Sequence, residues 1–216
     1  QKINTNILSY WKQYQPQATM VAMGTSCAYD PNIPMSAENY CKGDVDPNLY
    51  SYAMTKRMVH TGMVAFNDQY KMNYQTWIPP MLCGPDFDLE DSHFIFDLIR
   101  KIYNGKHHNE EVVLWGDGYQ KREMMYVKDA VDLMLKEDNK NNMIYNLSTE
   151  KEYTIRAYAK KICDILDYDH KKIVYDTNKF VGVRSKRLEP NIKYEPTNID
   201  FVIKEMIEYY EGKINE

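Results

Sequence analysis

Two short apolar runs separated by one long helical pattern constrain the fold of this chain more than any other feature. The first run covers residues 18–23 and lies between Pro16 and Gly24, and the second covers residues 74–79. Between them, residues 49–70 repeat apolar side chains at helical spacing. Parallel strands need a long crossover connection, which is usually a helix. The pattern therefore predicts an α/β fold with a doubly wound parallel sheet.

The rest of the chain continues to alternate between helical and strand patterns. Gly116-Asp117-Gly118 falls between two strand patterns and indicates a tight turn. The helix at residues 49–70 carries apolar residues on more than one face, so it should pack against something besides its own sheet. Helices are predicted for residues 5–14, 92–104, 127–137, 154–166 and 198–210, and strands for residues 112–115, 123–126, 143–147 and 173–175.

The charge balance and the cysteine pattern argue against several classes of function. The 216 residues include 27 Lys and Arg and 31 Asp and Glu, a net charge of −4 at pH 7, so nucleic acid is not expected as a partner. Apolar runs fall far short of the ~20 residues that span a bilayer, and residues 1–4 open no signal-peptide pattern, so we expect a cytoplasmic protein with no membrane partner. The four cysteines show no Cys-x-x-Cys spacing, which predicts reduced thiols and no metal site.

The sharpest local feature is the spacing of Tyr52 and Lys56. Residues four apart share a face of a helix, so the phenol and the ammonium point the same way. A nearby cation stabilises a phenolate and favours general acid/base chemistry. Thr25 and Ser26 follow the first predicted strand, where their hydroxyls could hold a carbonyl oxygen against Tyr52. Such pairs also occur as ordinary surface pairs, so the spacing alone leaves both interpretations open.

An ordered series of blocks resembles the extended short-chain dehydrogenase/reductase superfamily, and within it most closely the GDP-L-fucose synthases. These enzymes are NADPH-dependent epimerase-reductases that act on GDP-4-keto-6-deoxy-mannose. The resemblance is carried by residues 24–29, 50–56, 78–85, 91–93, 112–118, 121–123 and 174–176.

The resemblance implies a Rossmann-like fold of which only the C-terminal part is present. We expect residues 1–85 to form the C-terminal half of the NAD(P)-binding Rossmann domain. Residues 86–216 should form mainly a smaller α/β substrate domain for a nucleotide sugar, with some segments returning to the Rossmann domain. No Gly-rich phosphate loop occurs in the sequence, so the N-terminal cofactor-binding part is expected to lie before residue 1.

The resemblance also implies catalytic and cofactor-binding residues. Thr25, Tyr52 and Lys56 would serve the hydride chemistry, with Tyr52 as the proton donor. Cys27 and His93 match the base and acid of epimerisation, and thiols and imidazoles exchange protons near neutral pH. The cofactor would be NADP(H), held by Met23, Gly24, Thr25, Ser26, Tyr52, Lys56, Pro79, Pro80, Met81, Leu82 and His93.

For the substrate, the resemblance implies a nucleotide sugar, GDP-linked, held by Trp115, Arg122 and Lys186. Lys101 stands where the family has a substrate-binding arginine, with Arg100 beside it. A homodimer is implied as well, formed through the helix at residues 49–70 and the helix before it. Two alternatives stay open: another nucleotide-sugar epimerase or reductase of the superfamily, or a non-catalytic relic that binds a nucleotide sugar.

Overall fold

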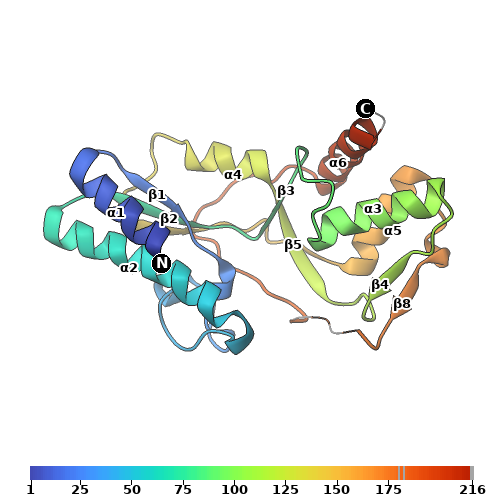
Figure 1. Ribbon diagram of the computed structural model, residues 1–216, viewed down its shortest axis with the longest axis horizontal. Helices are drawn as coiled ribbons and strands as arrows, with labels where there is room; N and C mark the ends of the chain where they lie inside the picture. The colour runs from blue at the N-terminus through green and yellow to red at the C-terminus, as the bar shows by residue number, and fades with distance from the viewer. Residues whose placement is uncertain (180, 182, 215–216) are drawn as a thin grey trace. The chain divides into compact units, whose positions relative to one another are not determined.

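The strand, helix and strand predicted near the N-terminus form a parallel sheet in the computed structural model (Figure 1). It joins β1 (Met20–Met23), β2 (Tyr74–Ile78) and β6 (Met143–Asn146) in the order β1-β2-β6. Both pairings are parallel, with Met23 opposite Trp77 and Ile78 opposite Asn146. Every residue of β2 is buried, as expected for the central strand of a sheet covered on both faces. The predicted doubly wound α/β sheet is confirmed.

The structure describes residues 1–179, 181 and 183–214, and the chain divides into two compact units. The first unit comprises residues 1–80, 130–148 and 187–194, and the second comprises residues 81–129, 149–186 and 195–216. The chain thus returns twice to the first unit after leaving it at Pro80.

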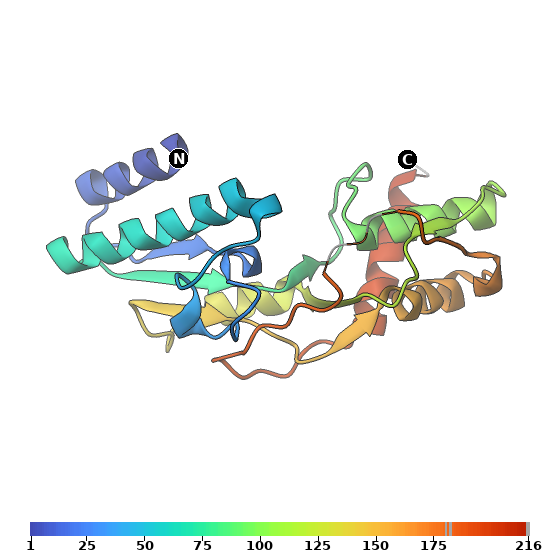
Figure 2. The same ribbon diagram turned by 90° about the horizontal axis from the view of Figure 1, so that it is seen from below.

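The long helix α2 (Tyr50–Tyr70) connects β1 to β2 and packs against both strands. Its other side is covered by α1 (Lys2–Tyr14), where the ring of Trp11 stacks on Phe66 with centroids 5.9 Å apart. Figure 2 shows α1 and α2 layered on one face of the sheet and α4 (Val127–Met134) on the other. The two apolar faces of α2 therefore have two partners, as the sequence predicted.

The second unit has two small sheets and three helices. β3 (Met81–Cys83) pairs with β5 (Lys121–Tyr126) in parallel, and β7 (Glu152–Thr154) pairs with β5 antiparallel, while β4 (Val113–Trp115) and β8 (Val174–Asp176) form a parallel pair. The helices α3 (Phe94–His107), α5 (Ile155–Leu166) and α6 (Ile199–Ile214) enclose a core that includes Ile99, Ile162 and Met206. Short 3-10 turns occur at Ser26–Ala28, Ala37–Asn39, Pro47–Leu49 and His170–Lys172.

The predicted turn at residues 116–118 joins strands of two different sheets. Gly116 and Gly118 have φ of 79° and 72°, which only glycine adopts without strain. β4 pairs with β8 while β5 pairs with β3 and β7, so the turn carries the chain from one sheet to another.

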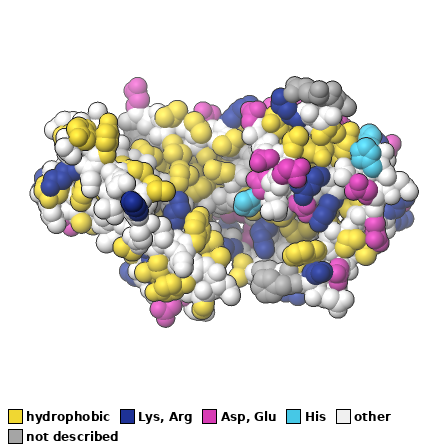
Figure 3. All heavy atoms as spheres, viewed as in Figure 1, with side chains coloured by type: hydrophobic (Ala, Val, Ile, Leu, Met, Phe, Trp, Pro, Cys, Tyr) yellow, Lys and Arg dark blue, Asp and Glu magenta, His cyan; other side chains and the backbone are white. Residues whose placement is uncertain are grey.

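Charged side chains of both signs are interspersed over the second unit on the face shown in Figure 3. Among the described residues, no helix is long and apolar enough to cross a membrane.

Candidate functional site

The segment after β1 turns sharply at the carboxyl end of the sheet. The backbone N–H of Gly24 donates to the carbonyl oxygen of Trp77 at 2.7 Å, so the ends of β1 and β2 meet as predicted. Thr25 then caps the 3-10 turn Ser26–Ala28, and its Oγ1 accepts the backbone N–H of Cys27 at 3.2 Å. Cys27 is half-buried in this turn. The turn therefore presents a hydroxyl and a thiol at the strand end, where ligands of such sheets bind.

Gly24 allows this turn because a side chain has no room there. A Cβ on Gly24 would lie 2.8 Å from Cγ1 of Ile78 and 2.9 Å from the phenol oxygen of Tyr40. The backbone at Gly24 thus lies closer to Ile78 and Tyr40 than a residue with a side chain could lie.

Tyr52 and Lys56 reach the same strand end from α2. Nζ of Lys56 donates to the carbonyl oxygen of Met23, the last residue of β1, at 2.9 Å. It lies 6.0 Å from the centroid of the Tyr52 ring, and Tyr52 is 50% exposed. The structure therefore places the Lys56 ammonium at Met23, which ends β1 two residues before Thr25. The exposed phenol of Tyr52 lies one helical turn from Lys56 on α2.

Arg57 was not anticipated from the sequence. It is buried, and its Nε donates to the carbonyl oxygen of Ala28 at 2.7 Å. Its two terminal nitrogens donate to the carbonyl oxygens of Gly43 and Lys42, both at 2.8 Å. These bonds tie the turn that carries Cys27 to the loop that follows it. The sequence feature that could have indicated its burial is its position four residues after Ala53, an apolar residue on the same face of α2.

His60 is a second buried polar residue on α2. Its Nδ1 lies 2.9 Å from Oγ1 of Thr76 on β2, and the rings of Tyr40 and Tyr74 contact it edge-on. Burial lowers the pKa of His60 to about 4, so the imidazole is neutral at physiological pH.

His93 lies in the second unit, at the N-cap of α3. Its Nδ1 is 2.6 Å from Oδ1 of Asp91, which also accepts the backbone N–H of His93 at 2.8 Å. That backbone bond is the main reason why the pKa of Asp91 falls below its ordinary value. Because Asp91 is an ionised acceptor, Nδ1 of His93 carries the proton of this hydrogen bond, which leaves Nε2 without a proton in the neutral ring, and the His93 side chain is 70% exposed.

A cavity of about 390 Å³ in the second unit gathers three of the predicted substrate residues, Lys101, Trp115 and Arg122. Trp115 is 58% exposed, and Nζ of Lys179 lies 5.7 Å from its ring centroid. Desolvation lowers the pKa of the Arg122 guanidinium from its ordinary value, and the group stays charged. The other lining residues are Ser92, Phe94, Asp97, Leu98, Leu114, Gln120, Ile155 and Val181.

Arg100 and Lys186 do not line this cavity. Arg100 donates to Oδ1 of Asp97 at 2.6 Å and to the carbonyl oxygen of Leu89 at 3.2 Å. The backbone N–H of Lys186 donates to Glu152 at 3.3 Å. Of the two neighbouring cations at positions 100 and 101, it is therefore Lys101 that reaches the cavity wall.

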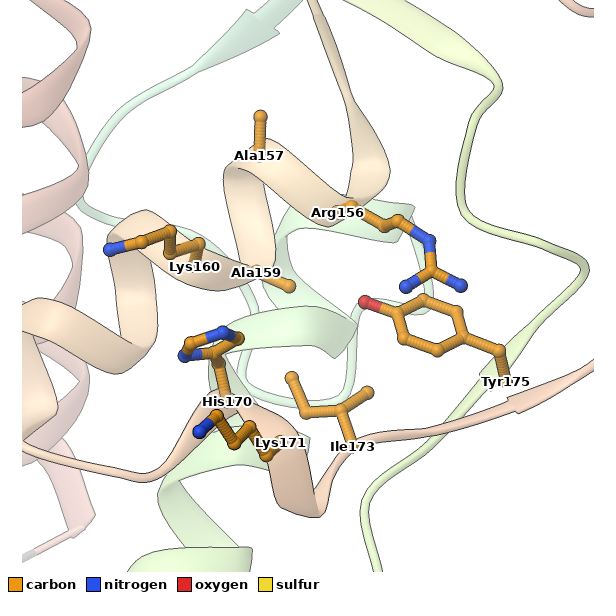
Figure 4. Close-up of a pocket in the computed structure, with 8 residues that line it drawn as sticks. All are labelled: Arg156, Ala157, Ala159, Lys160, His170, Lys171, Ile173 and Tyr175. Carbon is orange, nitrogen blue, oxygen red and sulfur yellow. The ribbon is translucent and has the colours of Figure 1, made fainter.

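A second concavity of about 570 Å³ on the same unit is also basic (Figure 4). The guanidinium of Arg156 lies over the ring of Tyr175 at 3.7 Å, and its Nε donates to the carbonyl oxygen of Asp117 at 2.7 Å. Lys160, which lies on the opposite side of Figure 4, pairs with Asp164 at 2.6 Å. Arg156 and Lys160 therefore already have partners in the protein. No residue predicted for substrate lines this concavity.

The described residues contain no group of three or more His, Cys, Asp or Glu side chains that could hold a metal ion.

Comparison with known proteins identifies the family of the chain. The model of the NAD dependent epimerase/dehydratase family matches residues 1–148. The chain belongs to the NAD dependent epimerase/dehydratase family.

Two curated members of related function are similar along most of the chain. A GDP-L-fucose synthase of Dictyostelium discoideum is 25% identical over 96% of this chain and 69% of its own length. A GDP-L-colitose synthase of Yersinia pseudotuberculosis is 31% identical over 82% of this chain and 60% of its own length. The solved structure of a GDP-L-fucose synthetase from Naegleria fowleri bound to NADP matches with a TM-score of 0.85 at 23% identity, covering 99% of this chain and 72% of that one. The matched regions thus span about two thirds of these epimerase/dehydratase relatives.

The strand end of the first unit gathers several of the residues that the resemblance implies for the cofactor. Met23 ends β1, with Gly24 and Ser26 after it, and Pro79 and Pro80 follow β2, so these backbones meet at one edge of the sheet. Lys56 and Tyr52 add an ammonium and a phenol beside them. The remaining predicted cofactor residues, Met81, Leu82 and His93, lie in the second unit.

Proposed function

We propose that this chain takes part in the NADPH-dependent epimerisation and reduction of GDP-4-keto-6-deoxy-mannose to GDP-L-fucose or a closely related GDP-deoxy sugar. The observation that carries this proposal is the cavity that gathers Lys101, Trp115 and Arg122 from separate segments of the second unit. An arginine and a lysine suit a diphosphate, and an exposed indole suits a base.

The proposed chemistry divides between two groups of residues. Cys27 and His93 move protons at the carbons that flank the ketone, because the carbonyl acidifies those protons. NADPH, when bound, supplies the hydride that reduces the carbonyl carbon. Tyr52 donates the proton to the carbonyl oxygen, Thr25 orients that oxygen, and Lys56 stabilises the tyrosinate that remains.

A second candidate product is GDP-L-colitose. The relative from Yersinia pseudotuberculosis that carries this name is 31% identical to the chain, a higher identity than that of the fucose synthase from Dictyostelium discoideum. The same proton-transfer residues would serve either sugar.

The proposal includes a homodimer that acts on a soluble nucleotide sugar in the cytoplasm. Ile3, Tyr10 and Tyr14 on α1 and Met58 on α2 are exposed apolar side chains that a second subunit would cover. Light scattering after size exclusion at micromolar concentration should give twice the mass of the chain, and a monomer would contradict this part of the proposal.

Deuterium exchange tests the epimerase half without the cofactor. GDP-4-keto-6-deoxy-mannose is incubated with the protein in heavy water without NADPH, and its mass is followed. We expect deuterium at the carbons beside the ketone, lost in Cys27→Ser and in His93→Gln. The matched controls Cys41→Ser and His108→Gln change an exposed thiol and an exposed imidazole elsewhere and should leave exchange intact. Absence of exchange in a folded sample would refute the proposal.

NADPH oxidation tests the reductase half. Tyr52→Phe removes the proton donor and should lower the rate of NADPH oxidation by about 10²- to 10⁴-fold while deuterium exchange continues. Tyr50→Phe removes another exposed hydroxyl two residues away and should change neither rate.

A further inference from the structure

Asp97 is the one acid among the described residues that line the cavity of Lys101 and Arg122. Its side chain is 24% exposed, so the carboxylate is accessible at the cavity wall. The arginine and the lysine suit phosphate oxygens, whereas a carboxylate repels them, because like charges repel. The wall therefore combines two groups that favour an anionic ligand with one group that opposes it.

The two oxygens of this carboxylate pair with two different cations of α3. Oδ2 lies 2.8 Å from Nζ of Lys101, and Oδ1 lies 2.6 Å from a terminal nitrogen of Arg100. Of these two cations, Lys101 lines the cavity, whereas Arg100 also donates to the carbonyl oxygen of Leu89 at 3.2 Å. Arg100 thus has two partners in the protein, and Lys101 is the cation that can turn to a ligand.

A diphosphate in this cavity must compete with Asp97 for Lys101. The pair is only partly buried, since 34% of the Lys101 side chain is exposed, and such pairs are weak because water screens them. A diphosphate carries more negative charge than one carboxylate, so it can displace Asp97 from the ammonium. When Lys101 leaves, Arg100 still neutralises Asp97, and no unpaired carboxylate remains in the wall.

We infer that Asp97 sets the affinity of this cavity for a nucleoside diphosphate by competing with the phosphates for Lys101. Lys101 exchanges Asp97 for a phosphate oxygen when the ligand binds, and Arg100 is a positioning residue that keeps Asp97 neutralised. The inference rests on the proposed function, which supplies the diphosphate. It assigns a role to Arg100 although this residue does not line the cavity.

Calorimetric titration of the 216-residue protein with GDP and with UDP tests the competition. Asp97→Asn removes the competitor and one negative charge, so we expect about three- to tenfold tighter binding of both nucleotides, which share the diphosphate. The gain should shrink as salt screens the charges. Asp164→Asn is the matched control, because it breaks a lysine–aspartate pair of the same spacing on α5, at 2.6 Å from Lys160, and Asp164 does not line the cavity. That variant should keep the affinity of the wild type.

Arg100→Met tests the positioning role. Without Arg100 the carboxylate holds Lys101 more strongly, so we expect about three- to tenfold weaker binding of both nucleotides. Arg100→Lys keeps a charge beside Asp97 and should restore most of the affinity. In the Asp97→Asn background, Arg100→Met should cause a much smaller loss, because Arg100 acts through Asp97. Thermal unfolding of each variant shows whether it is folded.

Three results would overturn the inference. These are binding by Asp97→Asn that is no tighter than that of the wild type, a gain confined to GDP, which would mean that Asp97 contacts the base, and no binding of either nucleotide. An equal loss from Arg100→Met in both backgrounds would refute the role of Arg100. The proposed function fails separately, when UDP binds more tightly than GDP. A protein that prefers UDP and binds both nucleotides more tightly in Asp97→Asn would keep the inference and refute the GDP link.

Discussion

Nδ1 of His93 lies 2.6 Å from Oδ1 of Asp91, and the same oxygen accepts the backbone N–H of His93. The carboxylate therefore fixes both the tautomer and the direction of the ring, and Nε2 is the nitrogen that can exchange a proton with a substrate. In the proposed epimerisation, Asp91 would therefore act through His93, as a positioning residue.

Asp91→Asn should slow deuterium exchange into the substrate by about tenfold to a hundredfold, because an amide no longer holds one imidazole tautomer. A change in the pH profile of exchange would separate this role from a purely structural one. Asp88→Asn is the matched control, since Oδ1 of Asp88 accepts the backbone N–H of Glu90 in the same kind of turn but holds no ring. Equal rates in the wild type and Asp91→Asn would contradict the positioning role.

Gly24→Ala should destabilise the protein by about 2 kcal/mol or more, because its Cβ would lie 2.8 Å from Ile78 and must push the strand ends apart. Gly212→Ala is a control with the opposite expectation. Gly212 lies inside α6, and a Cβ there meets nothing within 4 Å, so alanine should raise stability by up to about 1 kcal/mol. Denaturant unfolding measures both free energies, and a neutral Gly24→Ala would show that the strand end can relax.

Arg57→Lys should cost about 3 kcal/mol of unfolding free energy, although the charge is kept. A lysine cannot satisfy the three carbonyl oxygens of Ala28, Lys42 and Gly43 from one nitrogen at their observed positions. Arg184→Lys changes a side chain that is 75% exposed and should alter stability by less than about 0.5 kcal/mol. If both variants unfold at the same denaturant concentration as the wild type, the three bonds do not stabilise the loop.

Stability should fall as the pH drops from about 6.5 towards 4, because the pKa of His60 is lowered from 6.5 to about 4 in the folded protein. Above pH 6.5 the imidazole is neutral in both states and contributes no pH dependence. Between these values His60 binds a proton in the unfolded state but stays neutral in the folded state. The free energy of unfolding therefore falls by up to about 3 kcal/mol in total.

His60→Gln offers a hydrogen-bonding side chain to Thr76 without the titration. The free energy of unfolding of this variant should therefore depend less on pH between 6.5 and 4 than that of the wild type. Identical slopes in the two proteins would show that other groups cause the loss of stability.

The amino-acid sequence by itself determined where the main elements lie. The apolar run at residues 18–23 became β1 (Met20–Met23), and the helical pattern at residues 49–70 became α2 (Tyr50–Tyr70). The first follows from a continuous apolar run and the second from helical periodicity, and each segment carries its pattern independently of its partners. The short strands β3 (Met81–Cys83) and β7 (Glu152–Thr154) were not predicted. β3 comes directly after Pro79 and Pro80, and β7 runs directly into α5 (Ile155–Leu166), so neither stands apart as a separate apolar run.

The family motifs likewise lie in the sequence, and the resemblance implied Lys101, Trp115 and Arg122, together with Arg100 and Lys186, for the substrate. Only the tertiary structure decided that these three side chains line one cavity while Arg100 faces Asp97 and Leu89 instead. Adjacent residues on a helix point in different directions, and which of them meets a cavity depends on how the helix packs.

Burial of single polar groups was decided by the tertiary structure alone. Nothing in the local sequence distinguishes the buried Gln120 from an exposed glutamine. Nothing there indicates that Arg57 donates hydrogen bonds to three carbonyl oxygens. Hydrogen-bond satisfaction depends on atoms brought together from distant parts of the chain, whereas helix and strand periodicity depends on neighbours in sequence. The sequence therefore predicted the elements and the candidate chemistry, and packing decided which polar groups are buried, paired or left available to a ligand.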